Sequence, residues 1–154
     1  MIRSFMMTLS GAVVLALPLS MTAPRAMAAQ DMVELSIIEA GEHTLSEFLW
    51  EARPLVIFAD SEMDPNFLEQ MERLTVRPED LAVRDVVVII DTDPAARSPI
   101  RTELRPRGFD LVLIGKDGQK YLRKPSPWDI REISRSIDKM PLRLREMQDQ
   151  RLVR

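Results

Sequence analysis

The sequence contains no cysteine and a single histidine, His43. Without a thiol there can be no disulfide exchange, no cysteine nucleophile and no thiolate metal ligand. One histidine cannot form a zinc site alone, and His43 stands in a polar stretch where a surface position is expected. The absence of thiols is the firmest functional constraint that the sequence supplies.

Motifs that hold phosphates or activate a serine are also missing. The five glycines do not form a phosphate-binding loop. Ser61 has no base near it in the sequence and does not stand in a Gly-x-Ser-x-Gly elbow. We therefore expect no cofactor, and the sequence does not favour catalysis.

Residues 1–28 have the layout of a secretory signal peptide. Arg3 provides a positive start, residues 5–19 are mainly apolar, and Ala26-Met27-Ala28 is a small-x-small cleavage site. The apolar stretch is shorter than the ~20 residues that a membrane-spanning helix needs, so we expect no permanent membrane span. Cleavage after Ala28 would place the mature chain in the periplasm or outside the cell.

The charge of the expected mature chain is acidic. The formal net charge of the 154 residues is −3. Removing Arg3 and Arg25 with the signal peptide makes it about −5, which favours solubility and argues against nucleic acid as a partner. The remaining length is sufficient for one domain without disulfides.

Hydrophobic patterning after residue 28 predicts one α/β domain between an arm and a tail. We assign residues 29–43 to an N-terminal arm, 44–141 to the domain and 142–154 to a charged C-terminal tail. Strand-like apolar runs stand at residues 55–59, 85–91 and 111–114. Helical spacing follows Thr44, Asp64, Ser98 and Ser126. A helix between two buried strands implies a right-handed parallel crossover.

A β-hairpin is the strongest local signal. Residues 111–114 form an apolar run, and Tyr121 and Leu122 mark a more polar second strand. Between them, Gly115-Lys116-Asp117-Gly118 is typical of a tight turn that requires positive φ. Lys120 and Arg123 predict that the second strand lies at a sheet edge.

Four stretches together resemble a known family of domains of unknown function. They are residues 53–59, 84–88, 108–118 and 137–147. Gly-Lys-Asp-Gly in the hairpin and Asp-Lys-Met-Pro at 138–141 are the most specific parts. The family occurs alone in short exported proteins of proteobacteria, and in animal extracellular matrix proteins with sushi repeats or coiled coils.

This resemblance implies a fold similar to that of thioredoxins and peroxiredoxins, without an established activity. The expected fold class is thus α/β, a thioredoxin-like three-layer sandwich whose mixed sheet has a C-terminal β-hairpin and flanking helices. In thioredoxin-like proteins the redox cysteines follow the strand that corresponds to residues 55–59. Here Asp60-Ser61-Glu62-Met63-Asp64-Pro65 occupies that position, so peroxidase and disulfide-exchange activities are excluded.

The acidic loop has two interpretations. Asp60, Glu62 and Asp64 alternate, as the oxygen ligands of a divalent cation can. However, Pro65 stands where a calcium loop has glycine, and no glutamate follows at the required spacing. A helix cap at Asp64, with acids favoured by the helix dipole, explains the pattern better, and we predict no metal site.

Arg97, Arg101, Arg105 and Arg107 form a basic cluster. It could bind an anion or an acidic partner, or it could be a solvated surface of the usual kind. We retain Arg101, Arg105 and Arg107 as interface candidates.

The two tryptophans, Trp50 and Trp128, each stand near an expected helix end. An exposed tryptophan would indicate an interface. We interpret both as half-buried, which is the commoner state.

These observations lead to three functional hypotheses. The first is an exported, redox-inactive, thioredoxin-like domain that binds a protein partner in the periplasm. The second is an enzyme or a divalent-cation-binding protein that uses the loop from Asp60 to Asp64. The third is a purely structural role.

Export gives the first testable prediction. Expression of the full chain in a Gram-negative host should yield a periplasmic protein whose first residue is Ala29, as read by N-terminal sequencing. Ala28→Arg should block processing, because the peptidase accepts only small residues at that position. An unprocessed wild-type chain in the cytoplasm would contradict the assignment.

Overall fold

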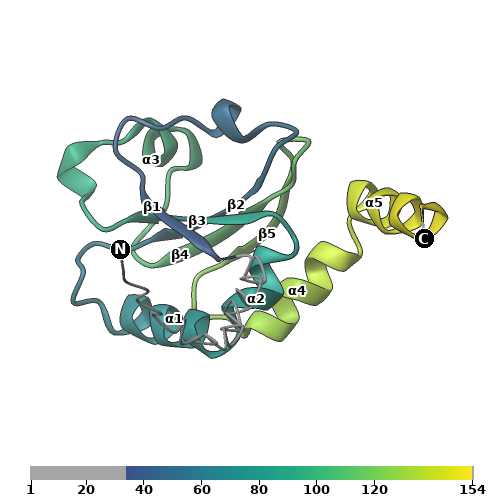
Figure 1. Cartoon of the computed structure of the whole chain (residues 1–154). Coiled ribbons are helices and arrows are strands. Elements are labelled where there is room, and N and C mark those ends of the chain that lie inside the picture. The colour runs from purple at the N-terminus through teal and green to yellow at the C-terminus, as the bar shows by residue number, and fades with distance from the viewer. Residues whose placement is uncertain (1–33, 154) are drawn as a thin grey trace, which may run out of the picture. The chain divides into compact units, whose positions relative to one another are not determined.

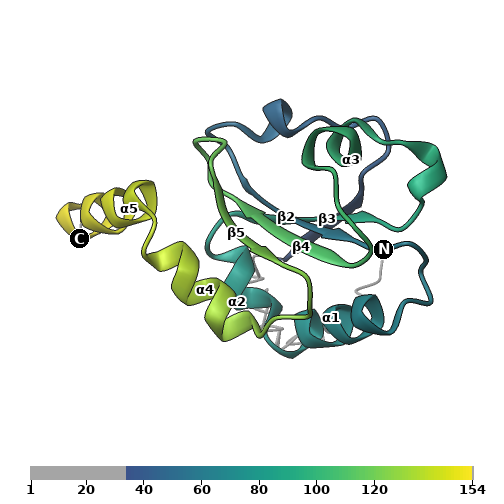
Figure 2. The ribbon, with the colours of Figure 1, turned by 180° about the vertical axis from the view of Figure 1, so that it is seen from behind.

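The computed structural model describes residues 34–153, so the expected signal peptide lies outside the described residues. They form an α/β fold with one open, mixed, five-stranded sheet and helices on both faces (Figures 1 and 2). Within this part of the chain, every helix is too short or too polar to cross a membrane.

The sheet is built around its central strand. The strand order is β1 (Ser36–Glu39), β3 (Val86–Asp91), β2 (Arg53–Phe58), β4 (Asp110–Ile114) and β5 (Lys120–Lys124). β1, β3 and β2 are parallel, whereas β4 and β5 are each antiparallel to their neighbours. Every residue of β2 is buried, because its side chains are covered on both faces.

Helices cover the two faces unequally. One face carries α1 (Pro65–Val76), α2 (Pro78–Ala82) and α4 (Ile130–Asp138). The other carries α3 (Pro99–Leu104) and the 3₁₀ helix η1 (Leu45–Phe48), as Figure 1 shows. A second 3₁₀ turn, η2 (Pro94–Ala96), precedes α3.

Alternation along β2 divides the core into two clusters. Leu55 and Ile57 pack with α1, α2 and α4. Val56 and Phe58 pack with α3 on the opposite face. Successive side chains of a strand point to opposite faces, so one strand supplies both cores.

Several local predictions are confirmed. Asp64 Oδ1 accepts hydrogen bonds from the N–H groups of Asn66 (2.8 Å) and Phe67 (3.2 Å), and it caps α1 as expected. The hairpin joins β4 to the edge strand β5, and Gly118 has the positive φ of 76° that its turn requires.

The interpretation of Trp50 is wrong. Trp50 is 68% exposed and has φ +66°, so it is not a half-buried core residue, although Trp128 is half-buried. The Trp50 N–H donates to Lys116 O (2.8 Å), a bond across the fold that holds this left-handed backbone.

The expected tail contains a helix, α5 (Pro141–Leu152), that lies beyond the end of α4 (Figures 1 and 2). An ionic network fixes it to the sheet. The fully buried Arg53 donates from Nη2 to Glu146 Oε1 (2.8 Å) and from Nη1 to Arg84 O (2.8 Å). Lys116 Nζ lies 3.3 Å from the same Glu146 oxygen.

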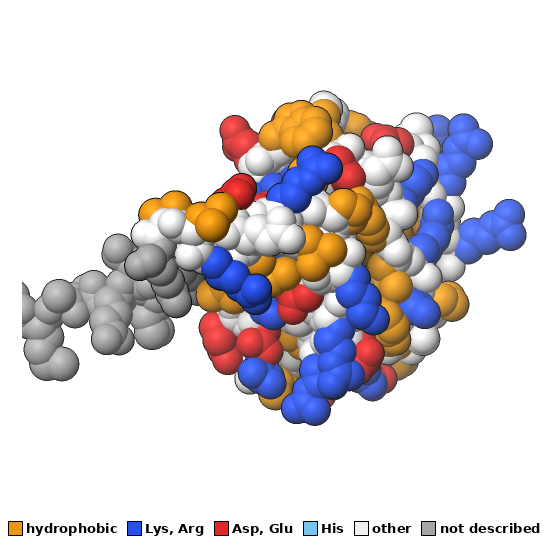
Figure 3. Space-filling view, turned by 90° about the vertical axis from the view of Figure 1, so that its right-hand side faces the viewer, with side chains coloured by type: hydrophobic (Ala, Val, Ile, Leu, Met, Phe, Trp, Pro, Cys, Tyr) orange, Lys and Arg blue, Asp and Glu red, His pale blue; other side chains and the backbone are white. Residues whose placement is uncertain are grey.

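A second set of ion pairs supports this contact. Arg84 donates to both carboxylate oxygens of Asp138, at 2.9 and 2.8 Å, and these hydrogen bonds lower the pKa of Asp138. Burial opposes ionisation of Glu146, but hydrogen bonds from Arg53 and Arg143 outweigh it, so the pKa of Glu146 is also lowered. Figure 3, which views the side that carries α5, shows acidic and basic side chains mixed with exposed hydrophobic ones.

Glu146 should therefore contribute to stability in a pH-dependent way. Glu146→Gln should lower the free energy of unfolding at pH 7 by roughly 1–2 kcal/mol, because the buried guanidinium of Arg53 loses the nearer of its two carboxylate partners, Glu146 and Asp85. Since the folded pKa is lowered, this contribution is complete above about pH 4.5, the ordinary value, and is lost as pH falls through the folded pKa.

Urea denaturation at several pH values measures the effect. Asp149→Asn, at an exposed position of the same helix, is the matched control and should leave stability unchanged. Equal stability of the Glu146 variant and wild type at pH 7 would show that the network does not hold α5.

Candidate functional site

The two predicted groups of charged residues meet at one end of the sheet. Phe58, near the end of β2, pairs with Asp91 at the end of β3 and with Asp110 at the start of β4. The acidic loop follows β2, and the arginine segment precedes β4. A Cβ built on Gly108 would lie 3.8 Å from Asp60 Oδ2, so the two loops adjoin.

The structure places the acidic residues in different roles. Asp60 and Glu62 are exposed, whereas Asp64 is half-buried and serves as the cap of α1. Ser61 Oγ accepts a hydrogen bond from the N–H of Met63 (3.0 Å), which stabilises the turn. Across residues 34–153, no three acidic, histidine or cysteine side chains are grouped so that they could hold a metal ion.

Arg101 is built into the fold. Its Nε donates to Asp91 Oδ1 (2.9 Å), and its Nη2 donates to Ala59 O and Asp91 O (2.9 Å each). The guanidinium also lies 5.3 Å from the centre of the Phe58 ring. Ser98 Oγ donates to the other oxygen of Asp91 (2.6 Å), so Arg101 ties α3 to the ends of β2 and β3.

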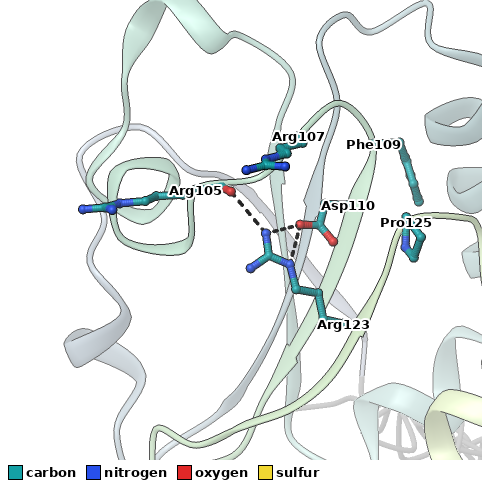
Figure 4. Close-up of a pocket in the computed structure, with 6 residues that line it drawn as sticks. All are labelled: Arg105, Arg107, Phe109, Asp110, Arg123 and Pro125. Atoms are coloured by element: carbon teal, nitrogen blue, oxygen red, sulfur yellow. Dashed lines mark hydrogen bonds and ion pairs between the residues drawn. The ribbon is translucent and has the colours of Figure 1, made fainter.

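Arg105 and Arg107 line an open pocket of about 470 Å³. The remaining lining residues are Phe109, Asp110, Arg123 and Pro125 (Figure 4). The side chains of Arg105 and Arg107 are both exposed. In Figure 4 the guanidinium of Arg105 points away from Asp110, while its carbonyl faces Arg123.

Arg123 forms the wall of this pocket. Its Nε donates to Asp110 Oδ2 (2.7 Å), its Nη1 to Leu104 O (3.1 Å) and its Nη2 to Arg105 O (3.3 Å). These bonds connect β5, β4 and the C-terminal end of α3. Asp110 is buried, so this pair fixes the shape of the pocket.

Sequence reasoning did not identify Arg123, Asp110, Phe109 or Pro125 as site residues. The available signal was the predicted hairpin, because an antiparallel pairing brings the end of β5 beside the start of β4. The observed register pairs Leu111 with Lys124, and this places the flanking residues together.

The chain matches a known protein family. Residues 44–146 match the domain of unknown function DUF4174. The chain belongs to this family. The match confirms the expectation that the chain belongs to a family of unknown function. The matched residues include strands β2 to β5 and Glu146. No curated protein matches the chain.

In this DUF4174 domain, substitutions of Arg101 and of Arg107 should differ in their effect on the free energy of unfolding. Arg101→Ala should lower the free energy of unfolding by about 2 kcal/mol, because it leaves buried Asp91 without its charged partner. Arg107→Ala should have little effect, since it removes an exposed side chain. Urea unfolding of both variants measures this, and equal effects would refute the distinction between a structural and a surface arginine.

Proposed function

We propose that this DUF4174 domain is an exported, redox-inactive, thioredoxin-like module that binds a protein partner. The strand order, the helix that follows the central strand and the C-terminal hairpin support a thioredoxin-like sandwich. The layout of residues 1–28 supports export. The proposed binding surface is the arginine pocket, which we define as Arg105, Arg107, Phe109, Asp110, Arg123 and Pro125.

The observation that carries this proposal is that the aspartates at this end of the sheet have structural partners, whereas two arginines beside them are exposed. Asp64 caps a helix, Asp91 is paired with Arg101, and Asp110 is paired with Arg123. A general acid or base needs a carboxylate that can reach a substrate proton, and these three are committed to the fold. Arg105 and Arg107 remain exposed beside them.

Exposed arginines beside an apolar wall suit recognition of an acidic segment. Arg107 can form bidentate hydrogen bonds with a carboxylate. Pro125 supplies exposed apolar surface in the same pocket, whereas Phe109 lines the pocket but is largely buried. Arginine is also enriched among the residues that dominate protein interfaces. A partner with an acidic side chain followed by an apolar one fits this chemistry.

A cation-binding or enzymatic role for the acidic loop has less support. Asp64 Oδ1 already accepts two backbone hydrogen bonds. Only the carboxylates of Asp60 and Glu62 then remain in this loop to bind a cation, and both are exposed. Calcium takes six to eight oxygen ligands.

Crosslinking capture in the periplasm tests the proposal. The baits are the tagged wild-type chain, Arg105→Ala with Arg107→Ala, and a control with Arg131→Ala and Arg145→Ala, two arginines exposed elsewhere. Wild type and control should capture the same partner, and the pocket variant should lose it. With purified partner, the pocket variant should bind roughly tenfold or more weakly.

Arg101 is left intact in every bait, so that a loss of binding does not reflect a loss of folding. Thermal unfolding of each bait should give the same midpoint. Capture of the same partner by the pocket variant and wild type, or of no partner by any bait, would refute the proposed binding surface.

A further inference from the structure

The two edges of the sheet are protected differently. The outer strand β5 carries Lys120, Arg123 and Lys124, and its pairing with β4 shifts in register between Leu113 and Ile114. Both features discourage the addition of another strand. At the opposite edge, residues 34–40 contain no lysine, arginine or proline, and the pairing of β1 with β3 has no break in register.

The backbone of β1 offers hydrogen-bonding groups on its outer side. The N–H of Ala40 donates to Ile90 O (2.8 Å), so this residue faces β3. Because N–H directions alternate along a strand, Ile38 also faces β3, whereas Ile37 and Glu39 direct their N–H and C=O groups outward. Among the described residues, no strand pairs with this outer side.

Side chains along this edge define what could pair with it. Ile37 is 45% exposed, which is unusual for an isoleucine within a sheet. Glu34 and Glu39 are exposed on either side of it. The edge is therefore apolar at its centre and acidic at both ends.

A second copy of β1 would be a poor occupant of this edge. An antiparallel pair centred on Ile37 would set Glu39 opposite Leu35 of the other copy and Glu34 opposite Ala40, so neither acidic side chain would gain a basic partner. The charge pattern instead fits a segment that is basic at both ends.

We propose that the outer edge of β1 binds an extended, basic segment of a partner protein, which adds to the sheet as a sixth strand. Main-chain hydrogen bonds to Ile37 and Glu39 provide affinity, as in other cases of strand addition. Lysine or arginine side chains of the segment pair with Glu34 and Glu39, and an apolar side chain between them covers Ile37. This surface is distinct from the arginine pocket and selects the opposite charge.

Peptide selection tests this inference directly. A phage library of short random peptides is selected against the chain that begins at Ala29, and enriched sequences are synthesised. Their affinity is measured by fluorescence anisotropy. Enriched peptides should carry basic residues on both sides of an apolar one, and NMR should show shifts at the amides of Ile37 and Glu39.

Two variants distinguish the contribution of side-chain charge to peptide binding from that of backbone hydrogen bonds. Glu34→Lys with Glu39→Lys should weaken binding roughly tenfold, since two ion pairs become repulsive. Ile37→Pro should abolish binding, because it removes an outward N–H that the added strand needs. The fold should be retained, because the substitution removes none of the hydrogen bonds to β3. Glu51→Lys with Glu103→Lys, at exposed positions elsewhere, is the charge-matched control and should bind as wild type does.

Some outcomes would overturn the proposal. One is a selection that enriches no sequence, and another is a peptide that binds the Glu34/Glu39 variant as tightly as wild type. A third is that the wild-type chain self-associates in analytical ultracentrifugation and that Ile37→Pro abolishes this self-association. That result would show that the edge binds a second copy of the chain instead. Thermal unfolding confirms that each variant is folded before binding is interpreted.

Discussion

The fold depends on a charge buried at the start of its central strand. Arg53 is fully buried, and an unpaired guanidinium there would cost several kcal/mol. Its partners come from the segment before β3, through the carbonyl of Arg84 and the carboxylate of Asp85, and from α5, through Glu146. The central strand, a neighbouring loop and the last helix must therefore be in place together.

Two further aspartate–arginine pairs close the other end of the sheet. Asp91 at the end of β3 is held by Arg101, and Asp110 at the start of β4 is held by Arg123. Both aspartates flank Phe58 in the sheet register. Because each arginine also binds backbone carbonyls, the pairs position the loops around the arginine pocket.

Features encoded by neighbouring residues could be predicted from the sequence. Asp64 followed by Pro65 indicated the start of α1, and the turn ending at Gly118 indicated the hairpin. The structural role of Arg101 could not be inferred in this way, since its bond to the carbonyl of Ala59 spans 42 residues. The backbone of Trp50 could not be inferred for the same reason, because its N–H bonds to the carbonyl of Lys116 on the hairpin, which is distant in the sequence.

The contact between Arg53 and Glu146 has a consequence for the order in which the protein can mature. The two residues are 93 positions apart, and a ribosome produces the chain from its N-terminus. The central strand therefore emerges long before its charged partner does. Asp85, 3.7 Å from Arg53, is synthesised soon after the central strand, but the nearer carboxylate is that of Glu146. The buried guanidinium therefore gains its shortest ion pair only after α5 has been made and has packed against the sheet.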